Sequence, residues 1–130
     1  MYDTKILSLY PFPEIEGEKY VPEDYIYDKI DNVCVLAILP KIITVCEIVK
    51  EGYTDSVKKL KVNNPVAWYL YYEQRAYITP FSKLKIKYLG RYVIYAIRSK
   101  NGLGKSKRIG FINKIIGLAY AFVLIIIRKE

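Results

Sequence analysis

The strongest constraint on this chain is an alternation of charged and apolar residues that begins after Ser82. Lys occupies every second position from 83 to 87, and Leu84, Ile86 and Tyr88 follow these lysines in turn. In an extended strand, such a pattern places the charges on one side and the apolar side chains on the other. The alternation resumes over residues 91–98, and Asn101-Gly102 then offers the positive-φ positions of a tight turn. The pattern predicts strands with one basic face, followed by a basic hairpin loop at residues 99–107.

Positive charge is concentrated in this same stretch. Residues 82–108 contain nine Lys or Arg and no Asp or Glu, in a chain with a formal net charge of +8. Residues 1–55 hold 11 acidic and 5 basic residues, whereas residues 56–130 hold 2 acidic and 16 basic residues. This separation favours an anionic partner such as nucleic acid or an anionic membrane surface. An ordinary solvated basic surface is the alternative.

The leading functional prediction is nucleic-acid binding without strong sequence specificity, through a basic, tyrosine-interleaved β-hairpin surface. Lys and Arg would neutralise phosphates, and interleaved tyrosines would stack on bases. The predicted phosphate-binding residues are Lys83, Lys85, Lys87, Arg91, Arg98, Lys100, Lys105, Lys107 and Arg108. The predicted stacking residues are Tyr88, Tyr92 and Tyr95.

The length and composition fit one compact domain, because 130 residues that are 52% apolar can bury a substantial core. The predicted fold class is α+β, with a mainly antiparallel sheet and two or three helices on one side. Strands are predicted near residues 4–10, 33–39, 83–89, 91–98 and 120–127. Helices are predicted near residues 41–51 and 65–77, with shorter helical segments at 22–30 and 54–61.

The helix predicted at 65–77 has a clear start, with Asn64 as cap and Pro65 at its first position. It contains more aromatic rings than one helix face can hold, so some rings would line an interface or lie exposed. This feature supports a second functional hypothesis, in which the protein is a structural or interaction subunit of a homo-oligomer. Its contacts would be the aromatic helix and the apolar C-terminus, against copies of itself or a membrane surface.

The C-terminal apolar run at residues 115–127 is only thirteen residues long. A spanning helix needs about 20 apolar residues, so this run is predicted to be a core element and not a membrane span. Two arrangements are open, namely a helix at 106–117 followed by a strand, or two strands with a bend at Gly117.

Residues 11–32 form a proline-containing, acidic segment that is predicted to be an extended arm. One interpretation is that the arm docks on the basic half of the molecule and competes with nucleic acid. The other is that the arm is a structural loop whose tyrosines pack into the fold.

Catalytic chemistry has few candidate residues. The chain contains no His, and residues 74–129 contain no carboxylate. The sequence therefore predicts no catalytic residue, metal site or cofactor, and favours a binding protein over an enzyme. A metal-dependent nuclease using Asp24, Asp28 or Glu47 is the less favoured alternative. Cys34 and Cys46 are interpreted as free thiols, and the N-terminus has no secretory pattern, which indicates an intracellular protein.

The overall composition, high in Ile, Tyr and Lys and lacking His, resembles that of small accessory proteins from viruses of hyperthermophilic archaea. The resemblance covers the whole chain as composition and includes no motif. It implies a small DNA-binding, host-modulating or virion protein, located in the host cytoplasm or the virion.

Overall fold

The computed structural model describes residues 4–35, 40 and 56–127. Within these ranges the secondary structure is helical and no strand is present. The helices are α1 Thr4–Ser8, α2 Asp24–Asp31, α3 Val57–Asn63, α4 Pro65–Ile78, α5 Lys83–Arg98 and α6 Phe111–Ile126. The predicted α+β fold with an antiparallel sheet is therefore wrong.

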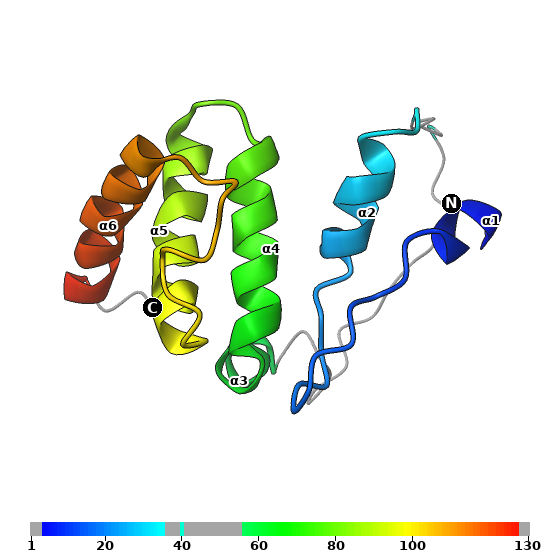
Figure 1. Ribbon diagram of the computed structural model, residues 1–130, viewed down its shortest axis with the longest axis horizontal. Helices are drawn as coiled ribbons and strands as arrows, with labels where there is room; N and C mark the ends of the chain where they lie inside the picture. Colours follow the sequence, from blue (N-terminus) through cyan, green and yellow to red (C-terminus); the bar gives the residue numbers. More distant parts are fainter. Residues whose placement is uncertain (1–3, 36–39, 41–55, 128–130) are drawn as a thin grey trace.

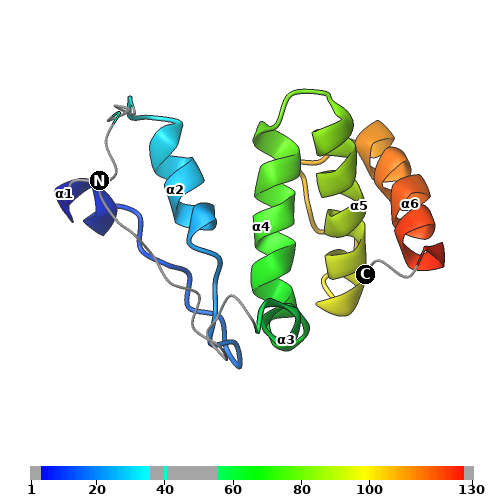
Figure 2. The same cartoon turned by 180° about the vertical axis from the view of Figure 1, so that it is seen from behind.

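Helices α4, α5 and α6 lie side by side, with α5 in the middle (Figure 1). Helix α2 lies on the other side of α4, and α3 lies at the end of α4 where that helix begins (Figures 1 and 2). The segment between α5 and α6 crosses one side of the α4–α5 pair in Figure 1 and lies behind the pair in Figure 2. The core sits between the three longer helices.

Helix α5 replaces the two strands predicted at residues 83–89 and 91–98. Its buried positions Leu89, Tyr92, Val93 and Ala96 recur at helical spacing, which the two-residue alternation of the preceding lysines obscured. Ser82 supplies the helix start, because its Oγ accepts a hydrogen bond from the Lys85 backbone N–H at 3.3 Å. Gly102 does adopt a positive φ of 73°, but it follows the end of a helix and closes no hairpin.

The prediction for α4 is confirmed, with a helix at Pro65–Ile78 that ends before Pro80. The helical segment expected at 22–30 is confirmed by α2, and the one expected at 54–61 overlaps α3. The strand expected at 4–10 is wrong, because this segment contains α1. Residues 33–35 are not a strand, while residues 36–39 and the helix predicted at 41–51 lie outside the described residues.

Helix α6 replaces the strand predicted at 120–127. It begins at Phe111, later than the start of the helix predicted at 106–117, and it continues through Gly117 without a bend between two strands. Two glycines allow α6 to pack closely on α5. A Cβ on Gly117 would lie 2.8 Å from the Leu89 carbonyl oxygen, and a Cβ on Gly90 would lie 2.6 Å from the Tyr120 ring. Real side chains do not fit at such distances, so glycine at these positions sets the separation of the two helices.

Aromatic rings fill the space between α4 and α5. Trp68 and Tyr72 of α4 pack near Tyr95 of α5, with ring centroids 6.3 and 5.4 Å from the Tyr95 ring. Tyr69 pairs with Tyr92 at 5.6 Å. These rings are all buried, and such pairs contribute roughly 0.5–1.5 kcal/mol each beyond the area they bury.

The acidic arm contacts the start of α4. The Glu18 carboxylate accepts hydrogen bonds from the backbone N–H groups of Val66 and Ala67, at 2.6 and 2.8 Å. Asn64, predicted as the helix cap, instead accepts hydrogen bonds from the Lys19 and Tyr20 N–H groups at 2.9 and 3.1 Å. The cap of α4 is thus a residue more than forty positions earlier in the chain, and the arm is part of the fold.

Replacing Gly117 by Ala should destabilise the protein by about 1–3 kcal/mol, since the new methyl group meets backbone atoms of α5 that cannot turn away. The effect should exceed the gain of about 1 kcal/mol that Ala brings to a helix interior. Gly104→Ala is the matched control, because a Cβ there meets nothing within 4 Å. Denaturant titration measures both variants, and equal stability of the two would contradict this account of the α5–α6 contact.

Replacing Glu18 by Ala should lower stability by about 0.5–2 kcal/mol, because two backbone donors at the start of α4 lose their acceptor. Glu16→Ala removes the same charge from an exposed position in the same arm and should be nearly neutral. Thermal melting compares the two. A Glu18→Ala variant as stable as Glu16→Ala would show that the arm does not support α4.

Candidate nucleic-acid interface

Five of the nine predicted phosphate-binding residues lie on α5, and four of these form a row along one side. Successive residues of an α-helix are about 100° apart, so positions 83, 87, 91 and 98 fall within about 80° of one another. We call Lys83, Lys87, Arg91 and Arg98 the basic row. Lys83, Lys87 and Arg98 are exposed, and Arg91 is half-buried. Lys85 lies on another side of the helix, where its Nζ donates to the Thr79 carbonyl at 2.9 Å.

The other four predicted residues, Lys100, Lys105, Lys107 and Arg108, lie exposed in the segment between α5 and α6. This segment packs on a different side of α5 from the basic row, since the Tyr92 hydroxyl donates to the Leu103 carbonyl at 3.5 Å. Tyr92 lies about 100° from Arg91 around the helix axis. The sequence predicted one continuous basic surface, whereas the structure divides the nine residues between two sides of the α4–α5 pair.

Two of the three predicted stacking residues do not present their rings to solvent. Tyr92 and Tyr95 are 0% exposed, and Tyr88 is half-buried. A base cannot stack on a ring that is enclosed by the protein, so the stacking role predicted for Tyr92 and Tyr95 is not compatible with this fold. The reason is the helical spacing of α5, which turns both rings towards α4.

Two buried rings instead support the arginines of the basic row. The Arg91 guanidinium lies 5.8 Å from the centroid of the Tyr72 ring, and the Arg98 guanidinium lies 5.3 Å from that of the Tyr95 ring. Arg98 also donates a hydrogen bond to the Tyr95 hydroxyl at 3.4 Å. Contact with an aromatic ring restricts an arginine side chain, which lowers the entropy lost when its guanidinium binds an anion.

The lysines at the start of α5 occupy an electrostatically unfavourable position. The first turn of α5 contains no acidic residue, although the N-terminus of a helix carries a partial positive charge. A cation in the first turn therefore costs a few tenths of a kcal/mol up to about 1 kcal/mol. A bound polyanion would relieve this repulsion. The lysines therefore do not serve to stabilise α5 itself.

The acidic arm does not face the basic row. Asp24 and Asp28, two of its three aspartates, pair instead with Arg75 of α4, at 3.2 and 2.8 Å. Tyr20 of the arm packs near Trp68, with centroids 6.2 Å apart. These contacts favour the interpretation of the arm as a structural segment, and sequence patterns gave no signal for the role of Arg75.

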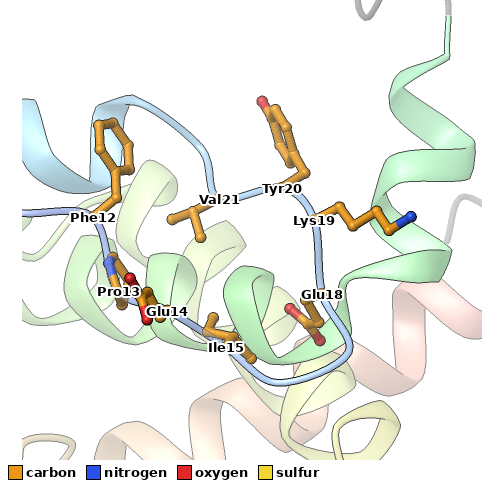
Figure 3. A pocket seen from close by; sticks show the side chains of 8 residues that line it. All are labelled: Phe12, Pro13, Glu14, Ile15, Glu18, Lys19, Tyr20 and Val21. Atoms are coloured by element: carbon orange, nitrogen blue, oxygen red, sulfur yellow. The ribbon is translucent and has the colours of Figure 1, made fainter.

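The arm also encloses an open hollow of about 380 Å³, lined by residues 12–15 and 18–21. Figure 3 shows the chain from Phe12 to Val21 curving around this space, with Glu18 beside the start of α4. The Glu18 carboxylate in its lining is already engaged by two backbone donors at the start of α4.

Within residues 4–35, 40 and 56–127, no three His, Cys, Asp or Glu side chains come together as a metal site would require. None of the helices in these ranges is long and apolar enough to cross a membrane. Cys34 is free and half-buried, and Cys46 lies outside the described residues.

The outer side of α6 is a surface that the sequence analysis considered only in its second hypothesis, where the apolar C-terminus contacts copies of the chain or a membrane surface. Apolar side chains exposed by 44–78% extend along the helix and its C-cap. They are Phe111, Ile112, Ile115, Leu118, Phe122, Val123, Ile125, Ile126 and Ile127. We call these residues the apolar face of α6. The sequence indicated a core element, but only the side bearing Gly117, Ala121 and Leu124 is buried.

Comparison of the chain with protein-family models, curated proteins and solved structures found no match. The case for function therefore depends on the geometry of these surfaces.

Burial raises the pKa of Tyr69, Tyr71 and Tyr92 above the ordinary value, so these phenols stay neutral in the folded protein. The unfolded chain releases these protons near pH 10, and stability should therefore fall as the pH rises above about 10. Tyrosinate absorbance followed against pH, with and without denaturant, measures the difference. Ionisation of every tyrosine near pH 10 in the folded protein would contradict the burial.

Proposed function

We propose that the protein binds nucleic acid without strong sequence preference, through phosphate contacts made by the basic row of α5. The observation that supports this proposal is the row itself, four cations on one side of a helix with no carboxylate in α5 or in the segment that follows. Positions 83 and 98 are about 22 Å apart along the helix axis, at about 1.5 Å per residue. A row of that length spans several phosphates of a nucleic-acid backbone.

The type of side chain favours backbone contacts over base reading. Lys presents a compact charge on a flexible stem, which suits phosphate attraction without fixed geometry. Arg91 and Arg98 have more restricted positions over Tyr72 and Tyr95, and they would fix how the backbone lies along the helix. Because the rings of Tyr92 and Tyr95 are enclosed, the proposal favours a duplex or a paired region over unstacked single strands.

The proposed binding should weaken linearly in a plot of log association constant against log salt. The expected slope is roughly −3 to −4, corresponding to about four phosphate contacts. The double variant Lys83→Ala with Lys87→Ala should reduce the magnitude of the slope by about 1.8, at roughly 0.9 for each lost contact. Fluorescence anisotropy with a short random-sequence duplex measures both.

Lys58→Ala with Lys59→Ala is the matched control, since it removes the same charge from exposed positions on α3. This control should keep the parent slope. A row variant that keeps the parent slope would remove α5 from the interface. A preference for unpaired strands that persists at high salt would instead require exposed rings and would contradict the proposed contact mode.

A further inference from the structure

The apolar face of α6 gathers nine exposed apolar side chains on one helix and its C-cap. Isolated exposed apolar residues are common, but a contiguous apolar patch of more than a few hundred Å² usually marks a contact with a protein or a lipid. Phe111, Ile112 and Phe122 are exposed by 78, 74 and 67%, and they lie on the same helix. No charged residue occurs between Lys114 and Arg128 to interrupt this face.

The fold holds α6 so that this face points away from the other helices. α6 is the outermost of the three adjacent helices, next to α5 and away from α4 (Figure 1). Its inner side is fixed by the close approach of Gly117 to Leu89 and Val93. Because one side of α6 is committed to α5, its apolar face is the side that the other described helices leave uncovered.

The helix dimensions exclude a spanning arrangement but suit one in the plane of a membrane. The 16 residues of α6 extend about 24 Å, less than the roughly 30 Å of a bilayer hydrocarbon core. A helix with one apolar side and one committed side resembles the interfacial helices of peripheral proteins, which sink about 5–10 Å into the headgroup and acyl boundary.

Charge complementarity distinguishes a lipid surface from a second copy of the chain. Residues 83–129 contain twelve Lys or Arg and no acidic residue. Lys107 and Arg108 are exposed just before α6, and the sequence continues after it with Arg128 and Lys129. A symmetric dimer through α6 would place the same basic surroundings on both sides of the contact, where they repel. Anionic lipid headgroups around an inserted apolar strip would attract these cations.

We propose that α6 docks this protein on an anionic lipid bilayer, with its apolar face inserted in the plane of the headgroup and acyl boundary. The neighbouring Lys107 and Arg108 contact the headgroups. This inference is independent of nucleic-acid binding, because the centre of the basic row lies about 120° around α5 from the centre of the positions that contact α6, Leu89, Gly90 and Val93. A protein docked in this way would keep the row exposed.

The full chain is tested by sedimentation with vesicles of phosphatidylcholine alone and with about 30% phosphatidylglycerol added. The parent protein should bind the anionic vesicles, and more strongly than the neutral ones. Phe122→Ser with Ile126→Ser should weaken that binding by at least about tenfold, because two of the inserted side chains become polar. Phe111→Ser with Ile112→Ser tests the other end of the helix and should act in the same direction.

The matched control is Phe81→Ser with Val62→Ser, which changes side chains of similar exposure, 72 and 69%, away from α6. This control should bind vesicles like the parent, and circular dichroism checks that each variant is folded. Parent-like vesicle binding by both α6 variants would overturn the proposal. Equal binding of the parent to neutral and anionic vesicles would also overturn it.

Light scattering after gel filtration tests whether the protein instead dimerises through α6. A dimer that dissociates in the Phe122→Ser, Ile126→Ser variant, together with no vesicle binding by the parent, would assign the apolar face to a second copy and overturn the lipid proposal. Duplex binding by this same variant should match the parent. Loss of vesicle binding with intact duplex binding would separate the two proposed surfaces.

Discussion

Ring packing between α4 and α5 supports almost every other feature of the described structure. Trp68 and Tyr72 meet Tyr95 across the two helices, and this contact fixes how α5 is rotated about its own axis. Trp68 also meets Tyr20 of the arm, and the rings of Tyr72 and Tyr95 lie beneath the guanidinium groups of Arg91 and Arg98. The aromatic residues thus act through their burial, because they set the positions of the charged groups around them.

The rotation of α5 about its own axis determines what each of its sides contacts. One side packs on the rings of α4, another accepts the close approach of α6 at Leu89 and Gly90, and the side between them carries the basic row. The apolar face of α6 and the basic row consequently point in different directions. Both surfaces depend on the same central helix for their positions.

Three acidic side chains of the arm bind groups of α4 and do not pair with the basic row. Glu18 accepts two N–H groups at the start of α4, where an anion is favoured by the unpaired donors and the helix dipole. Asp24 and Asp28 of α2 pair with Arg75 in the last turn of α4. These three acidic residues therefore hold the arm and α2 against α4, away from the basic row.

The sequence by itself determined the features that depend on local chemistry. The start of α4 at Pro65 and its end before Pro80 follow from the geometry of proline, and the uneven charge follows from composition. Only the tertiary structure decided whether residues 83–98 form strands or a helix. The lysine alternation favoured a strand, but Leu89, Tyr92 and Val93 also fit a helix, and a strand would need a partner that the described helices do not provide. The tertiary structure likewise decided which tyrosines are buried, that Glu18 caps a distant helix, and that α6 exposes one side, because each depends on contacts between residues far apart in the chain.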